Sequence, residues 1–209
     1  MSTTDPRVRT RKAPAERAAE ILDAATAIAR EQGLGALTLR AVADRAGVAS
    51  GLIAHYQPSM DDLVARVYSD LVEEEIREVR ALAAREASPA ARFARVLETL
   101  LDGSREDLTV VWVESWAISR RNPALAAAVR RQMSVWQLLL VEIADEGVAD
   151  GSFATAETSA VAWQIMGMVD GLNAQSLVRE ADPATAIAQM SRAAETLLGA
   201  RPGSLALAR

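Results

Sequence analysis

The sequence predicts an all-α protein of about nine helices in two domains, and three observations support this fold class. Apolar residues recur at intervals of three and four along most of the 209 residues, which is the period of a helix buried on one face. Proline, asparagine, serine and glycine interrupt this period where helices are expected to begin and end. Residues 39–56 contain two short helical segments joined at a glycine, which is typical of a helix-turn-helix.

The first helix is predicted from Pro14 to about Gln32. Proline is favoured at the first position of a helix, and Gly33 can adopt the left-handed conformation that often follows the last turn. Residues 1–13 are polar and basic without an apolar period, so we expect a disordered arm there. The apolar face of the helix consists of Ala18, Ile21, Leu22, Ala25, Ile28 and Ala29.

The helix-turn-helix is predicted between Thr38 and Pro58. A short amphipathic helix begins after Thr38 and stops at Gly47, and a second helix containing Ile53 ends before Pro58. The second helix of such a motif lies in the major groove of DNA. Residues 14–58 are therefore predicted to form a DNA-binding domain.

Residues 59–199 are predicted to form a larger helical domain. Ser59 is placed to cap a helix that runs to about Arg85, and such a helix spans about 35–40 Å at 1.5 Å per residue. The tail from residue 200 is expected to be loose. Further helices are expected at about 89–103, 105–120, 123–147, 155–179 and 183–198.

Residues 14–64 resemble the DNA-binding domain of the TetR family of bacterial transcriptional regulators. The run GLIAHY, residues 51–56, is similar to the betaine-responsive branch of that family. The resemblance implies a homodimeric regulator in which residues 59–199 bind a ligand and mediate dimerisation. The matching residues are Thr38, Val42, Ala43, Ala46, Gly47, Val48, Gly51, His55, Tyr56, Asp61, Asp62 and Leu63.

Four positions depart from the family pattern. Ala49, Ala54, Gln57 and Met60 stand where Ser or Thr, Tyr, Phe and Lys are usual. The Tyr hydroxyl and the Lys ammonium normally contact phosphates, so the affinity for the DNA backbone is expected to be lower or to come from other residues. Ser50 remains as a possible cap for the second helix of the motif.

Three residues around the first helix of the motif are candidates for phosphate contacts. Thr38 can cap that helix, and the free amides beside it can also bind a phosphate. Arg40 and Arg45 flank the motif with positive charge, although arginines on any protein surface are commonly just solvated.

The second helix of the motif supplies the other DNA-binding candidates. Residues at the N-terminal end of a recognition helix usually read base edges, so we expect Ser50 and Gly51 against DNA and Ile53 packed inward. Tyr56 is expected near the DNA backbone with its hydroxyl directed at a phosphate. The family resemblance implies a backbone contact or a supporting role for His55.

The four tryptophans fall in the larger domain and are candidates for an effector site. Trp112 and Trp116 lie one turn apart on one helix face, and Trp163 and Asp170 share a face of a later helix. Aromatic rings and a carboxylate can bind a cation through cation–π attraction and charge pairing. The alternative is that the tryptophans are core residues and that Asp170 bonds a neighbouring helix. Glu114 is expected on the face opposite Trp112 and Trp116.

Composition excludes several classes of protein. The chain has no cysteine, so disulfides, thiolate nucleophiles and the usual zinc sites are excluded. The single histidine, His55, has no nucleophile or paired carboxylate beside it, so no catalytic residue, metal or cofactor is predicted. No apolar run approaches the about 20 residues that span a bilayer, and the N-terminus lacks a secretory signal. A cytoplasmic protein without membrane contact is expected.

Charge is distributed as expected for a DNA-binding regulator. Residues 1–60 contain eight Lys or Arg and six Asp or Glu, whereas the whole chain has a net charge of −5. A mildly basic N-terminal region can bind DNA phosphates, whereas the acidic remainder of the chain is repelled by them.

These observations predict a ligand-responsive repressor that binds a palindromic operator in double-stranded DNA as a homodimer. A small-molecule effector, with cations among the candidates, would release it. Apolar residues of the last two helices, including Leu172 and Leu198, are expected to form a four-helix interface with a second chain. The long helix is expected to carry the switch, as the element that reaches from one domain into the other.

Two alternatives to this function remain from the sequence. The first is an effector-independent regulator or an activator of the same fold. The second is an all-helical enzyme, for which no nucleophile–base pair, metal cluster or phosphate loop is present.

Overall fold

A computed structural model describes residues 13–180 and 182–206, and over these residues the chain forms nine α-helices, one short 3-10 helix and no strand. The prediction of an all-α fold is confirmed. Of the arm predicted over residues 1–13, residues 1–12 lie outside the described part, and Ala13 is the N-cap residue of α1. The helices are α1 (Pro14–Gln32), α2 (Leu39–Ala46), α3 (Ser50–Tyr56), α4 (Met60–Ala83), α5 (Pro89–Leu101), α6 (Glu106–Ser119), α7 (Pro123–Ala149), α8 (Thr158–Ser176) and α9 (Pro183–Leu198), with η1 (Leu34–Ala36) between α1 and α2.

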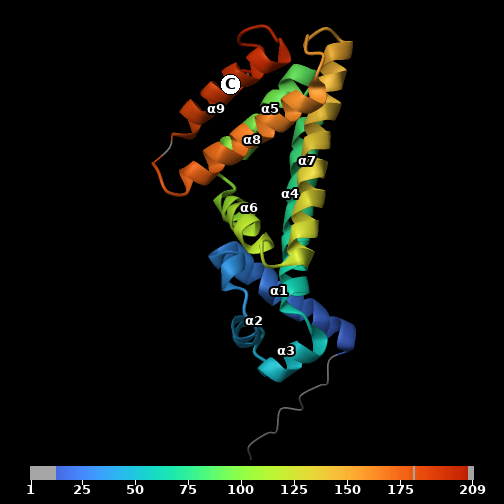
Figure 1. Cartoon of the computed structure of the whole chain (residues 1–209), viewed down its shortest axis with the longest axis vertical. Helices are drawn as coiled ribbons and strands as arrows, with labels where there is room; N and C mark the ends of the chain where they lie inside the picture. The colour runs from blue at the N-terminus through green and yellow to red at the C-terminus, as the bar shows by residue number, and fades with distance from the viewer. Residues whose placement is uncertain (1–12, 181, 207–209) are drawn as a thin grey trace, which may run out of the picture.

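The molecule is elongated, with α1, α2 and α3 at one end (Figure 1). We call residues 14–58 the head and residues 59–199 the body. In the body α4 and α7 run side by side along the long axis, α8 crosses them, and α9 lies at the outer edge beside α5. Helix α6 lies between the head and α8.

Local sequence explains the helix-turn-helix of the head. The Thr38 hydroxyl accepts a hydrogen bond from the Ala41 amide at 3.1 Å, and Gly47 ends α2 with a φ of 65°. Ile53 is fully buried, as the sequence predicts. The expected Ser50 cap is wrong: Ser50 is the first residue of α3, and the N-cap residue is Ala49, which forms no side-chain hydrogen bond. An N-cap must precede the helix and adopt an extended backbone, and Ala49 occupies that place.

Two polar caps set the start of the body. The Ser59 hydroxyl accepts a hydrogen bond from the Asp62 amide at 3.1 Å at the start of α4. The Asn122 side chain accepts one from the Leu125 amide at 2.9 Å and donates one to the Asp61 carbonyl at 3.0 Å. Asn122 therefore joins the first turns of α4 and α7 next to the head.

The end of the chain packs onto the body. Leu205 is buried, and its amide donates a hydrogen bond to the Glu195 carboxylate at 3.0 Å. The prediction of a loose tail is therefore wrong for residues 200–206, while residues 207–209 lie outside the described part. Leu198 is 0% exposed within its own chain, so the prediction that it forms a dimer interface is also wrong. An amphipathic pattern marks a buried face without saying which chain buries it.

Candidate DNA interface and effector pocket

The exposed face of α3 carries the predicted base-reading residues. Ser50, Gly51 and His55 are exposed, whereas Tyr56 is half-buried. The rings of His55 and Tyr56 meet edge to face with centroids 5.1 Å apart, which holds both at the C-terminal end of α3. A Cβ atom added at Gly51 would meet no atom within 4 Å, so nothing inside the chain requires glycine there.

The three candidates for phosphate contact differ in whether their side chains already have bonding partners within the chain. Thr38 is exposed and caps α2. Arg45 donates two hydrogen bonds of 2.6 Å to the Glu31 carboxylate, and this pairing lowers the pKa of Glu31 below its usual value. Arg40 is nearly fully exposed and lies 3.7 Å from Asp44. Arg40 is therefore free to bind a phosphate, whereas Arg45 would first have to leave Glu31.

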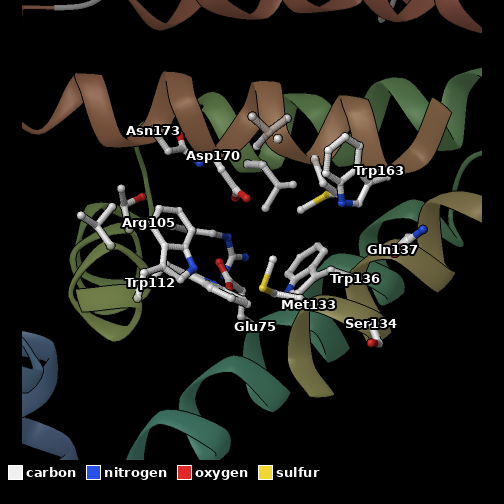
Figure 2. A pocket seen from close by; sticks show the side chains of 17 residues that line it. Glu75, Arg105, Trp112, Met133, Ser134, Trp136, Gln137, Trp163, Asp170 and Asn173 are labelled. Carbon is white, nitrogen blue, oxygen red and sulfur yellow. The ribbon is translucent and has the colours of Figure 1, made fainter. Parts of the chain in front are cut away.

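A cavity of about 250 Å³ in the body brings together all four residues predicted for the effector site. Helix α6 contributes Trp112 and Trp116, and α8 contributes Trp163 and Asp170. Figure 2 shows Trp163 of α8 with Trp136 and Met133 of α7 on one side of the cavity, across from Trp112. We call this cavity the tryptophan pocket.

Sequence reasoning missed several residues of the tryptophan pocket. Glu75, from α4, is only 4% exposed and accepts a hydrogen bond from the Trp112 indole at 3.0 Å. The sequence does mark Glu75 as unusual, because it is a carboxylate on an otherwise apolar helix face. Leu71 and Val79 lie one turn to either side of it, and both are buried. The other missed lining residues include Arg105, Met133, Trp136, Gln137, Met166 and Asn173.

Two carboxylates point into the tryptophan pocket, as Figure 2 shows for Asp170 and Glu75. Burial raises the pKa of Asp170 to about 6 and also raises the pKa of Glu75, against the opposing effect of the Trp112 hydrogen bond. Ionisation of both groups is disfavoured relative to a carboxyl group in water, because burial removes water from the charge. A cation placed between them would favour the ionised forms.

The pocket also holds hydrogen-bond donors. Arg105 donates from its terminal nitrogen to Glu78 at 2.9 Å, but its buried Nε has no partner among the described residues. The indole nitrogens of Trp116 and Trp136 are likewise buried without a partner in the described part of the chain. A buried unpaired donor is costly, so these groups favour a ligand that also carries an acceptor.

A second hollow, of about 610 Å³, adjoins the tryptophan pocket. It lies between the ends of α5 and α8 and the start of α9, and it shares Leu100, Arg105, Thr109 and Asn173 with the pocket. A small molecule could enter by this side.

Helix α6 connects the pocket to the head. Trp112 and Trp116 face the pocket, whereas Glu114 accepts a hydrogen bond from the Gly35 amide at 2.9 Å. The carboxylate fits so closely that a Cβ atom added at Gly33, whose φ is 83°, would lie 2.5 Å from Glu114 Oε2. The prediction that Glu114 faces away from the tryptophans is confirmed.

A second contact fixes the first turn of α6 to the head. Arg30 of α1 forms an ion pair of 2.7 Å with Asp107 in the first turn of α6, and its other nitrogen lies 3.4 Å from Glu74 of α4. The expectation that the long helix alone reaches between the domains is therefore wrong. The sequence carries no signal that α6 packs against η1.

Neither a metal site nor a membrane-spanning helix is found among residues 13–180 and 182–206. Among the described residues, no three His, Asp or Glu side chains come together in a way that could bind a metal ion. No helix in the same residues is long and apolar enough to span a bilayer.

Two protein-family models match the chain. The model of the C-terminal domain of BetI-type transcriptional repressors matches residues 89–199, and the model of bacterial regulatory proteins of the tetR family matches residues 21–67. The first match covers most of the body and the second covers most of the head.

Proteins of similar sequence are transcriptional regulators. The HTH-type transcriptional regulator BetI of Cronobacter sakazakii is 28% identical over 117 residues, which are 53% of this chain and 57% of that protein. The HTH-type transcriptional repressor KstR2 of Mycolicibacterium smegmatis is 28% identical over 145 residues, 67% of this chain and 69% of the relative. The similarity to the BetI relatives thus spans little more than half of their length.

Solved structures share the fold. A TetR transcription regulator from Haloarcula marismortui superposes with a TM-score of 0.73 at 21% identity and covers 88% of this chain and 97% of its own. A transcriptional regulator from Saccharomonospora viridis, in complex with choline, gives a TM-score of 0.74 at 20% identity over 88% and 96% of the two chains.

Proposed function

The chain belongs to the TetR family of bacterial transcriptional regulators, and we propose that it is a repressor that binds a palindromic operator as a homodimer and is released by a small cationic effector. The observation that carries this proposal is the tryptophan pocket, which combines four tryptophans with two carboxylates. The bodies of two chains would set the spacing of two heads on half-sites about one helical turn apart or a multiple of it.

We assign operator binding to the exposed side of the head. Ser50 and Gly51 would face base edges, and Thr38, Arg40, His55 and Tyr56 would contact the DNA backbone. Arg45 would join them only where a phosphate displaces Glu31, because its two hydrogen bonds of 2.6 Å are already made.

Gly51 offers a sharp test of this assignment. The substitution Gly51→Ala removes a helix-destabilising glycine and meets no atom of the chain, so the free energy of unfolding should stay the same or rise by up to about 1 kcal/mol. On DNA the added methyl group would clash if the backbone at Gly51 approaches the groove closely. Operator affinity measured by fluorescence anisotropy should therefore fall while thermal stability does not. Unchanged operator affinity would remove Gly51 from the interface.

The effector assignment rests on charge and aromatic faces. A cation gains from the tryptophan rings through cation–π attraction and from Asp170 and Glu75 through charge. The choline bound to the regulator of similar fold from Saccharomonospora viridis supports a small quaternary ammonium compound as a probe for this pocket.

Choline affinity should depend on pH in a defined direction. Burial raises the pKa of Asp170 to about 6, and a cation binds the ionised carboxylate, so affinity should fall as the pH drops through 6. Where binding requires ionisation of one group, the loss is about tenfold per pH unit below its pKa. Isothermal titration between pH 5 and pH 8 measures this. The variant Asp170→Asn should bind more weakly at pH 8 and keep only the pH dependence due to Glu75; an identical profile in that variant would contradict the assignment.

One experiment tests the function as a whole. DNA from the promoter region of the protein's own gene is titrated with protein at several salt concentrations, with and without choline. We expect tight binding whose affinity falls steeply with salt, by a log–log slope of about 0.9 for each phosphate contact. We expect choline to weaken it. Absence of binding, or an affinity that does not change with salt concentration, would refute the repressor. An affinity that changes with neither choline nor apolar compounds would favour the effector-independent regulator.

A further inference from the structure

The second hollow continues the tryptophan pocket beyond one of its walls. Leu100, Arg105, Thr109 and Asn173 line both cavities, so these residues form the boundary between them. The hollow holds about 610 Å³, whereas the pocket holds about 250 Å³. A ligand that is longer than the pocket can therefore extend into the hollow between these residues.

The two cavities differ in the chemistry of their walls. The pocket is lined by four tryptophans, whereas none of the described residues that line the hollow is aromatic. The hollow is lined instead by many amide and hydroxyl side chains, which donate and accept hydrogen bonds without carrying charge. These polar residues are Thr109, Asn173, Gln175, Ser176, Thr185 and Gln189. Such walls suit a polar chain better than an aromatic or purely apolar one.

Positive and negative groups around the hollow nearly balance. Its charged lining residues are Arg105, Arg179, Glu106, Glu180 and Asp182. Asp182 is already occupied, because its carboxylate accepts the hydrogen bonds that cap the start of α9. Arg179 donates a hydrogen bond to Gln175 at 3.0 Å. The hollow therefore favours a neutral chain over a second charged group.

Arg105 lies at the boundary of the two cavities and offers a hydrogen-bond donor. Its terminal nitrogen donates to Glu78 at 2.9 Å, so its charge is already countered, while its buried Nε has no partner among the described residues. Figure 2 shows Arg105 and Asn173 at the end of the pocket away from Trp163. A buried N–H without an acceptor is costly, and an acceptor oxygen on a ligand at this boundary would remove that cost.

We propose that the second hollow is a subsite for the tail of an elongated effector, a quaternary ammonium compound with a neutral chain that carries an ester or amide carbonyl. The proposal rests on the tryptophan pocket being the effector site. The ammonium group lies among the tryptophan rings and Asp170, and the carbonyl oxygen accepts the Nε–H of Arg105. The rest of the chain lies among the amides and hydroxyls of the hollow. Choline has the ammonium group but lacks the chain and the carbonyl.

Two compounds of equal chain length test the carbonyl contact. Butyrylcholine carries the ester carbonyl, and heptyltrimethylammonium has a saturated chain of the same length. Titration calorimetry with the full-length protein gives the ratio of their affinities. This ratio should fall by about tenfold in Arg105→Lys, which keeps a cation beside Glu78 but lacks the Nε–H. Because both compounds are measured on both proteins, a general weakening of the pocket cancels in the comparison.

A second variant fills the hollow and leaves the pocket unchanged. Ala186 of α9 is half-buried and lines the hollow but not the pocket, so Ala186→Phe places a ring where the tail would lie. Butyrylcholine affinity should fall by about tenfold while choline affinity stays the same. Ala188→Phe is the matched control, because Ala188 is exposed on the same helix and does not line the hollow. Circular dichroism verifies that both variants retain their helices.

The outcomes separate the subsite from the effector site. If Ala186→Phe binds butyrylcholine as tightly as Ala188→Phe does, or if Arg105→Lys leaves the affinity ratio unchanged, the hollow is not a subsite. The effector site then still stands on the binding of choline. If the wild type binds none of the three compounds, the effector site is wrong and the subsite fails with it. Binding of the compounds without any binding to promoter DNA would instead refute the repressor and leave the subsite standing.

Discussion

Choline should still bind the variant Glu114→Ala but should release it from the operator much less than it releases the wild type. The Glu114 carboxylate is the point at which α6 holds the loop between α1 and α2, through the Gly35 amide at 2.9 Å. The opposite side of α6 carries Trp112 and Trp116, so a ligand that moves these rings moves Glu114 with them. Removing the carboxylate leaves the pocket intact and removes one of the two contacts by which α6 is joined to the head.

The size of the effect follows from the coupling that this contact carries. Typical couplings between two sites correspond to a change of about 5- to 150-fold in affinity. We expect the ratio of operator affinities without and with choline to fall from this range toward one in Glu114→Ala, leaving the part carried by α4 and by Arg30. Fluorescence anisotropy with labelled operator at saturating choline measures the ratio, and titration calorimetry verifies that choline affinity is unchanged.

Two variants control this measurement. Glu114→Gln keeps an oxygen that can accept the Gly35 hydrogen bond, so it should retain much of the response. Glu106→Ala removes a carboxylate from the exposed first turn of the same helix and should respond like the wild type. If Glu114→Ala is released by choline as efficiently as Glu106→Ala, α6 does not transmit the signal through this contact.

Gly147→Ala should strongly destabilise the protein, although alanine is the better helix former. Gly147 lies near the end of α7, where an added Cβ atom would be 2.1 Å from the ring of Phe153. Phe153 cannot give way, because it is buried and its ring meets Phe93 edge to face at 6.0 Å. Overpacking of this kind costs about 1–3 kcal/mol, more than the gain of up to about 1 kcal/mol from replacing glycine in a helix.

Thermal unfolding at fixed protein concentration shows whether Gly147→Ala lowers or raises the stability of the protein. A loss of 1 kcal/mol lowers the Tm of a chain of this size by about 2–4 °C. Gly51→Ala is the matched control, because its surroundings are open and its Tm should stay or rise. A Tm for Gly147→Ala at or above that of the wild type would mean that α7 and the residues after it can separate without cost.

The sequence predicts the helices of this protein well because the residues at each end determine where a helix begins and ends. Pro14, Pro89, Pro123 and Pro183 each stand at the first position of an observed helix, as their fixed backbone angle favours. The body helices end within a few residues of the positions predicted from glycine and polar residues. The 3-10 helix Leu34–Ala36 was missed because three residues carry no period.

Contacts between distant segments were predicted less well. The sequence brings Trp112, Trp116, Trp163 and Asp170 together as candidates, and the fold places all of them around one cavity. It does not reveal that α9 and Leu205 pack on their own chain, because an apolar stripe looks the same whichever surface covers it. It also does not reveal that Arg45 is paired with Glu31, since fourteen residues and a turn separate the two.

Under the effector site proposed above, the two faces of α6 also limit how the ligand specificity of the protein could be changed. A substitution at Trp112 or Trp116 would alter ligand recognition and, through the same rigid turn, the position of Glu114. Met133, Gln137 and Met166 line the same cavity from α7 and α8, and not from α6, whose Glu114 contacts the head. A library confined to these three positions could therefore change which compound is detected while the ratio of induced to repressed expression stays as it is.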